Sequence, residues 1–258
     1  MKAKKSVMAS LFVLAVAQVL VSCVYSTDVL NSDSPKITQK RNLKGFERID
    51  VYGSPTVYYT QADSFSVVLE GPEDLVSKII TNVEGNTLSV RNKGKIGIVN
   101  ISIGSMNDVK VYVSSPDLIG VGLYGSGDFM SERHVDTDNL QISLRGSGDI
   151  DFGEVICDNC NSELVGSGDL SIRKLEAQTS TVSLVGSGDI SIKQKNVHNT
   201  DINLRGSGDV EIDFTEGCKT AVCNLVGSGD IKLTGYLSSF NRHKVGSGDI
   251  DTDRLQVR

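Results

Sequence analysis

The segment Leu144-Arg145-Gly146-Ser147-Gly148-Asp149-Ile150 contains the motif that decides the fold of this 258-residue chain. Its tetrad Gly-Ser-Gly-Asp occurs seven times, and the first glycines are Gly125, Gly146, Gly166, Gly186, Gly206, Gly227 and Gly246. Successive tetrads start 21, 20, 20, 20, 21 and 19 residues apart. A period near 20 residues is typical of one coil of a solenoid or of one leucine-rich repeat. The Leu ladder and the Asn or Cys of a leucine-rich repeat are missing, so the sequence predicts an all-β solenoid (β-helix) of about seven 20-residue coils.

Apolar residues flank each tetrad at even offsets. In the repeat quoted above they are Ile142 and Leu144 before the tetrad, and Ile150 and Phe152 after it. Even offsets share one face of an extended chain, so these positions should stack into apolar ladders inside the solenoid. If the chain stays extended through the tetrad, both glycines also point inward, while the serine and aspartate point outward. The tetrad is therefore predicted to be a corner, where glycine allows the strand to bend.

The last repeat departs from this pattern. Its inward positions hold Arg242, Lys244 and Thr252 instead of apolar residues. Charge at the end of a solenoid discourages edge-to-edge association of unpaired strands. We therefore interpret the last repeat as a charged cap.

The outward aspartates would form a row, which we call the Asp ladder. Its members are Asp128, Asp149, Asp169, Asp189, Asp209, Asp230 and Asp249. Coils stack about 4.8 Å apart, and carboxylates at that spacing repel by roughly 1 kcal/mol in water. Hydrogen bonds from backbone N–H groups or serine hydroxyls at the corner could offset this repulsion. The alternative is a ladder of bound cations such as Ca²⁺, although calcium-binding β-rolls use a nine-residue period and another motif.

A second outward row, here called the outer stripe, consists of the residues directly before the tetrads. They are Tyr124, Arg145, Val165, Val185, Arg205, Val226 and Val245. An exposed row of this apolar character can mark a surface that binds a partner. The same residues could instead be covered by a neighbouring loop, and the sequence leaves both interpretations open.

Four cysteines lie in the repeat region, at Cys157, Cys160, Cys218 and Cys223. The two pairs are three coils apart, or roughly 14 Å along the axis, which excludes a shared zinc site or a disulfide between the pairs. Cys223 occupies an inward ladder position. A disulfide within either pair, or free thiols, would both suit the predicted fold.

No catalytic constellation is evident in the sequence. His134, His198 and His243 fall at unrelated offsets from their tetrads. We therefore predict a protein that is not an enzyme and uses no cofactor or metal, with a polysaccharide-active β-helix enzyme as a less favoured alternative. The net charge of −6 and the absence of a basic stripe argue against nucleic-acid binding.

The first 22 residues are predicted to be a signal peptide. Lys2, Lys4 and Lys5 precede the apolar stretch 9–21, which ends just before Cys23. A small residue followed by cysteine resembles the bacterial lipoprotein signal, in which the cysteine is acylated. We expect a lipid anchor at Cys23 in the outer membrane, and the sequence does not decide between the periplasmic and the surface side. A flexible polar tether is expected over residues 23–40.

Residues 41–116 are predicted to be a β-rich region before the solenoid of residues 117–258. The expected elements are strands at Phe65–Leu69, Ile79–Glu84, Thr87–Arg91, Ile96–Ile103 and Val109–Val113, and a helical turn within Pro72–Lys78. Gly85-Asn86 should join two of these strands in a hairpin. The region could be a small antiparallel sheet or irregular coils continuous with the repeats.

Three motifs outside the tetrads carry a resemblance to a known family. They are Gly45-Phe46-Glu47-Arg48-Ile49, Asn86-Thr87-Leu88-Ser89-Val90 and Ser115-Pro116-Asp117-Leu118. Together with the lipoprotein-like signal they resemble the putative auto-transporter adhesin, head GIN domain family of bacterial envelope proteins, over roughly residues 41–257. The resemblance implies a right-handed, single-stranded β-helix and an adhesin, which would bind a glycan or protein at the cell surface. A purely structural envelope component is the alternative.

Overall fold

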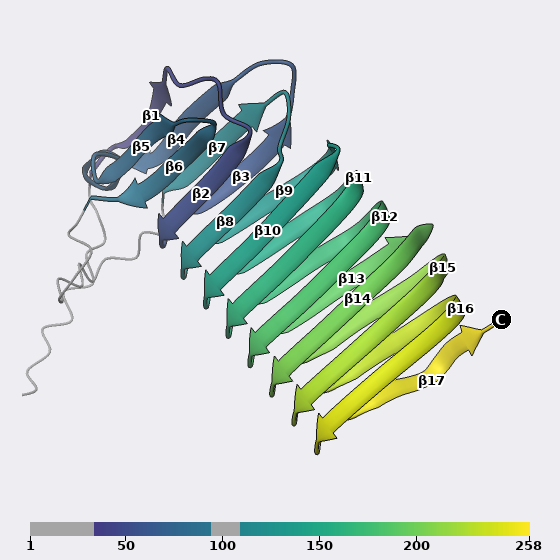
Figure 1. The fold of residues 1–258 in the computed structure, drawn as a ribbon. Helices are drawn as coiled ribbons and strands as arrows, with labels where there is room; N and C mark the ends of the chain where they lie inside the picture. Colours follow the sequence, from purple (N-terminus) through teal and green to yellow (C-terminus); the bar gives the residue numbers. More distant parts are fainter. Residues whose placement is uncertain (1–33, 94–108) are drawn as a thin grey trace, which may run out of the picture. The chain divides into compact units, whose positions relative to one another are not determined.

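The computed structural model describes residues 34–93 and 109–258. Residues 1–33, which include the predicted signal peptide and Cys23, and the predicted strand at 96–103 lie outside these ranges. The described chain is a right-handed β-solenoid whose parallel coils stack one on another (Figure 1). The prediction of an all-β solenoid is confirmed.

The tetrad-containing part of the solenoid consists of strands β8 to β17. Their bounds are β8 (Gly120–Gly125), β9 (Asp128–Asp136), β10 (Asn139–Gly146), β11 (Asp149–Gly166), β12 (Asp169–Gly186), β13 (Asp189–Lys195), β14 (Val197–Gly206), β15 (Val210–Gly227), β16 (Ile231–Gly246) and β17 (Ile250–Val257). Each coil runs from one tetrad along a first strand segment, turns at a second corner, and returns to the next tetrad. Adjacent coils pair in parallel and place equivalent residues side by side, as with Leu144, Leu164 and Leu184.

The core is a set of stacked apolar ladders, as predicted. Ile142, Leu144, Ile150 and Phe152 are all buried, as are their counterparts in the neighbouring coils. Aromatic rings enter the core mainly near the N-terminal coils, where the Phe129 and Phe152 ring centroids are 5.5 Å apart. Because the inner residues are bulky and aliphatic, the solenoid interior is packed with side chains.

The N-terminal region contains the elements that precede the first tetrad. They are β1 (Lys36–Arg41), β2 (Arg48–Gly53), β3 (Thr56–Gln61), β4 (Ser66–Pro72), α2 (Glu73–Val76), β5 (Ile79–Glu84), β6 (Thr87–Asn92) and β7 (Lys110–Ser115). The predicted helical turn and the β5–β6 hairpin are confirmed. Strand β2 pairs in parallel with both β6 and β8, and β3 pairs in parallel with both β7 and β9. The β2–β3 coil therefore lies between β6–β7 and β8–β9.

Both arrangements considered for this region occur together. Parallel coils continue into it, so the predicted boundary at residue 116 lies within the stack. Antiparallel pairs, β1 with β4, β4 with β7 and β5 with β6, are added at its edge. The predicted tether is wrong for residues 36–40, because β1 is an edge strand in register with β4 from Lys36 opposite Pro72 to Arg41 opposite Val67. Its polar composition suits an edge strand, which buries only part of its side chains.

The tetrad corners bring the backbones of successive coils into close contact. The N–H groups of Ser147 and Gly148 both donate to the carbonyl of Gly125, at 2.9 and 3.2 Å. A Cβ atom on Gly148 would overlap the carbonyl oxygen of Gly127 in the previous coil. Gly146 has a φ of +146°, a conformation that residues with side chains rarely adopt. Both glycines of the tetrad are therefore required, one by its backbone conformation and the other by the stacking distance.

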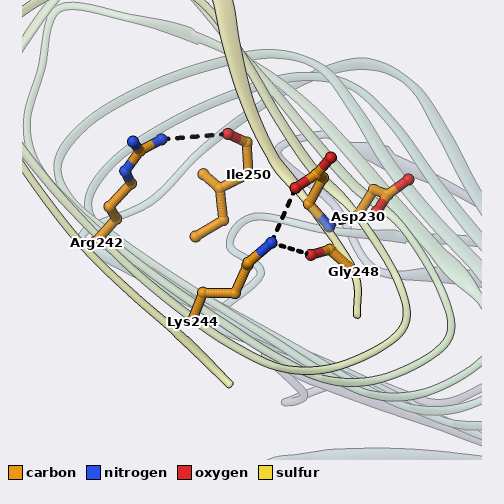
Figure 2. Close-up of polar contacts among 6 residues, drawn as sticks. Asp230, Arg242, Lys244, Gly248 and Ile250 are labelled. Atoms are coloured by element: carbon orange, nitrogen blue, oxygen red, sulfur yellow. Dashed lines mark hydrogen bonds and ion pairs between the residues drawn. The ribbon is translucent and has the colours of Figure 1, made fainter. Parts of the chain in front are cut away.

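The last described coil ends in a polar cap (Figure 2). Lys244 Nζ donates to the Gly248 carbonyl at 2.7 Å and to Asp249 Oδ1 at 2.9 Å. Arg242 Nη1 donates to the Ile250 carbonyl at 3.5 Å. These two side chains start at inward ladder positions and satisfy acceptors to which the N–H groups of a further coil would otherwise donate. The interpretation of Arg242 and Lys244 as a charged cap agrees with this geometry.

We expect Gly188→Ala to lower the free energy of unfolding by about 2 kcal/mol or more, since a Cβ there overlaps the backbone carbonyl of Gly168. The matched control is Ser187→Ala, an exposed position one residue away, for which a change within about 0.5 kcal/mol is expected. Urea unfolding followed by circular dichroism measures both. Equal stability of the two variants would contradict the role of close stacking.

Candidate functional site

The tetrads present two outward side chains at every corner. Ser147 and Asp149 are exposed, while Gly148, Leu144 and Ile150 are buried. The same alternation occurs in the other coils, so the predicted orientation of the tetrad is confirmed. The Asp ladder thus forms a continuous row on the outside of the solenoid.

Backbone hydrogen bonds connect the members of the Asp ladder. The N–H of Asp169 donates to Oδ1 of Asp149 at 3.1 Å, and the pattern repeats to Asp249, whose N–H donates to Oδ1 of Asp230 at 2.7 Å. The intermediate links, at Asp189, Asp209 and Asp230, measure 2.9–3.1 Å. The carboxylates from Asp149 to Asp230 therefore each accept a charge-assisted bond from the next coil, which offsets the repulsion between neighbours.

This geometry favours the structural explanation of the Asp ladder. Over residues 34–93 and 109–258, no group of three or more His, Cys, Asp or Glu residues is arranged to hold a metal ion. One carboxylate oxygen per linked residue is already used by a backbone donor. Cation binding by the ladder stays a prediction that the structure does not test.

A degenerate tetrad at Gly53-Ser54-Pro55-Thr56 precedes the seven regular ones. Gly53 pairs with Gly125 and Thr56 with Asp128, and Thr56 Oγ1 donates to Asp128 Oδ2 at 3.2 Å. The Gly53 carbonyl also accepts the N–H groups of Ser126 and Gly127. The tetrad motif does not reveal this corner, because Pro55 and Thr56 replace the second glycine and the aspartate. The shared Gly-Ser pair was the available signal.

The outer stripe is exposed to solvent along much of its length. The exposed fractions of Val185, Val226 and Val245 are 41%, 40% and 53%. Arg145 lies in the same row and pairs with Glu163, with Nη2 3.1 Å from a carboxylate oxygen. Within the described ranges, no loop covers these valines, so the interpretation of the row as an exposed surface is favoured over that of a covered one.

The β2 strand extends the outer stripe by one coil. The Tyr52 and Tyr124 rings stack with centroids 4.9 Å apart and planes at 15°. Burial and the nearby Asp50 carboxylate raise the pKa of Tyr52. Arg48 pairs with Asp50 at 3.3 Å and reaches Gln141 Oε1 at 3.2 Å across β8. The sequence did not indicate these contacts, because β2 carries no regular tetrad.

A shallow cavity of about 320 Å³ lies on the stripe between its central coils. Its lining includes Val185, Arg205, Asn203 and Val226. Apolar and hydrogen-bonding groups therefore alternate within one small area, which suits contact with a partner surface.

The four cysteines of the repeats are all buried and unbridged in this structure. Cys223 lies in the core, where burial raises its pKa to about 12. Burial also raises the pKa of Cys218, whose Sγ contacts the Thr220 carbonyl at 3.3 Å and Thr200 Oγ1 at 3.6 Å. The three histidines lie on separate strands: His134 on β9, His198 on β14 and His243 on β16.

A family model described as putative auto-transporter adhesin, head GIN domain matches residues 45–224. The chain belongs to this family. The match begins at the Gly45-Phe46 motif. It includes the degenerate tetrad and five of the seven regular tetrads, up to the one that starts at Gly206. No curated protein matches the sequence.

Solved structures of similar fold include two putative adhesins and a putative lipid binding protein. A putative adhesin from Bacteroides fragilis is 25% identical, with a TM-score of 0.63, and the alignment covers 83% of this GIN-domain chain and 96% of that one. A putative lipid binding protein from Parabacteroides distasonis is 21% identical, with a TM-score of 0.68 and coverage of 85% and 98%. A putative adhesin from the same species is 19% identical, with a TM-score of 0.68 and coverage of 84% and 96%. The latter two likenesses concern the fold alone.

The family description and the description of the 25% identical structure both name an adhesin. In the part of the GIN-domain chain that the structure describes, no helix is long and apolar enough to cross a membrane. The exposed outward rows of the solenoid are the candidate functional surfaces.

We expect Asp189→Ala to lower the free energy of unfolding by about 1 kcal/mol, because it leaves the Asp209 N–H without its acceptor. Asp189→Asn keeps an acceptor oxygen and should retain most of the stability. Urea unfolding measures both variants, and equal losses would contradict the hydrogen-bond role.

Melting curves of the unchanged chain with calcium and with a chelator test cation binding, since a bound ion raises the melting temperature.

Proposed function

We propose that this GIN-domain chain is a non-enzymatic adhesin of the cell envelope that binds a partner protein through the outer stripe. The observation that carries the proposal is the repeated exposure of Val185, Val226 and Val245 in one row of a parallel sheet. The inward positions of the same strands are already filled by aliphatic residues. The exposed valines are therefore additional to the core. Apolar side chains that recur on an outer face are typical of a surface that is covered when a partner binds.

The chemistry of the stripe favours a protein partner over a glycan. Glycan sites commonly offer an open aromatic face, but the Tyr52 and Tyr124 rings stack on each other. Valine and arginine instead dominate the exposed part of the row, and arginine is enriched in protein interfaces. Arg205, beside the cavity at Val185 and Val226, would supply hydrogen bonds to such a partner.

A variant that places charge on the stripe tests the proposal. We expect Val185→Glu, Val226→Glu and Val245→Glu together to weaken binding more than tenfold, because three carboxylates oppose burial of the row. The matched control places three charges at exposed positions along the opposite edge of the coils, as Gln178→Glu, Asn199→Glu and Ser238→Glu. Biolayer interferometry of the purified chain measures binding to the envelope protein fraction of the cells that produce it, and to envelope glycans separately.

The outcomes separate the alternatives. Loss of binding in the stripe variant alone, with unchanged circular dichroism and melting, supports the proposal. Equal binding by both variants, or binding to glycans alone, would overturn the assignment of the stripe. An unchanged chain that binds neither fraction indicates a structural component, and turnover of a polysaccharide indicates an enzyme.

We further propose that the chain is held at the membrane by acylated Cys23. The support is the sequence Leu20-Val21-Ser22-Cys23 after a basic and apolar leader. Multiple acyl chains give a stable anchor without a transmembrane helix. Its partners would then be reached from the outer membrane.

We expect Cys23→Ser to move the chain from the membrane pellet to the soluble fraction of lysed cells. The reason is that serine cannot carry the thioether-linked lipid of this signal. Immunoblots of both fractions measure the change, and Cys157→Ser is the control that leaves the leader intact. A Cys23→Ser chain that stays in the pellet after a high-salt wash would refute the anchor.

A further inference from the structure

Two cysteines share one corner of the solenoid interior. Cys157 and Cys160 lie on β11 at the second corner of the coil that starts with the Gly146 tetrad. Their exposed fractions are 8% and 2%, so both side chains point inward while Asp158 and Asn159 between them face outward. Two inward side chains on either side of a bend converge, which is the orientation that a disulfide requires.

The backbone of this corner is held in place by its neighbours. The N–H groups of Asp158 and Asn159 both donate to the Asp138 carbonyl, at 2.9 and 3.3 Å. Asn159 Nδ2 donates to Asn139 Oδ1 at 2.7 Å, and Thr179 Oγ1 donates to Asn159 Oδ1 at 2.6 Å. Because three coils fix the bend, the relative positions of the two thiols are set by the fold.

The two thiols flank the same bend at buried positions. The neighbouring Cys157 thiol lowers the pKa of Cys160, although burial opposes its ionisation. The residues paired with them in the following coil are Ala177 and Ser180. These small neighbours leave the sulfur atoms free to approach each other.

The other cysteine pair shows a different arrangement. Cys218 contacts the carbonyls of His198 and Thr220 and the hydroxyl of Thr200, and no contact joins it to Cys223. Burial is the main cause that raises the pKa of both thiols. The chain thus contains one buried pair that flanks a corner and one buried pair that is farther apart along β15, and the second pair serves as an internal comparison.

Cys157 lies closer to the surface of the corner than Cys160 does. It lines a surface cavity of about 380 Å³ together with Asp136, Asp158, Glu176 and His198. A small disulfide molecule that enters this cavity would meet Cys157 before Cys160, which lies deeper in the core.

We propose that Cys157 and Cys160 are an oxidative modification site, at which a low-molecular-mass disulfide converts the two thiols to one intracoil disulfide. Both cysteine S–H bonds and the S–S bond of the oxidant break, and a new S–S bond forms between Cys157 and Cys160. The oxidant takes up the electron pair and both protons, and it leaves as two small thiols. The product covalently closes the second corner of this coil. An oxidising envelope would favour this state.

The test uses the folded, purified full chain incubated with oxidised glutathione. After acid quenching, the protein is unfolded, alkylated with a maleimide and digested with trypsin. Cys157 and Cys160 fall together in the peptide Gly146–Arg173, whereas Cys218 and Cys223 fall in the separate peptides Gly206–Lys219 and Thr220–Lys232. Mass spectrometry then assigns each cysteine without ambiguity.

We expect the peptide Gly146–Arg173 to lose two hydrogen atoms and to carry no maleimide, while the other two peptides are alkylated. Alkylation of both Cys157 and Cys160, or preferential crosslinking of Gly206–Lys219 to Thr220–Lys232, would overturn the proposal. Cys160→Ser should trap glutathione on Cys157 because no second thiol can displace it. Cys157→Ser should leave Cys160 unmodified, and glutathione on Cys160 in that variant would refute entry through Cys157.

Discussion

Backbone-to-backbone contact at the tetrad corners is the constraint on which this solenoid depends. Each second glycine, such as Gly148, lies directly against the carbonyl of its counterpart one coil earlier, and each first glycine adopts a φ that favours glycine. A side chain at either position would separate the coils or distort the bend. Because the corners fix the spacing and register of the coils, the apolar ladders inside and the polar rows outside follow from them.

The register also explains how the solenoid tolerates a row of carboxylates. In-register stacking places each Asp of the ladder next to another. It also places the backbone N–H of one Asp within hydrogen-bond distance of the carboxylate of the preceding Asp, as with Asp189 and Asp169. The donor that offsets the charge is therefore supplied by the same repeat that creates the charge. Recurrence of Asp at the corners is accounted for by these hydrogen bonds, and this makes the variable outer stripe the better candidate for function.

The inner ladders and the corners could be predicted because parallel coils of nearly equal length align residues of equal offset. The arrangement of the N-terminal coils could not be predicted, because their order in space differs from their order in sequence. Strands β6 and β7 lie on the far side of β2 and β3, away from β8. Pro55 and Thr56 also conceal the first corner. Likewise, β1 has the composition of a linker, and only its pairing with β4 shows that it is a strand. The stripe was predicted as a row, but its extension through Tyr52 depends on the β2–β8 pairing.

The last described coil and the outer stripe of this solenoid differ in the energetic cost of binding a partner. At the last described coil, Lys244 and Arg242 occupy acceptors that another strand would need, and they place two charges where an added coil would bury them. Docking of a strand there would bury these charged groups in an apolar interior, which is strongly unfavourable. The outer stripe carries no such penalty, since its valines lose only water when they are covered. A partner should therefore bind across the coils, and its affinity should depend on how many coils it spans.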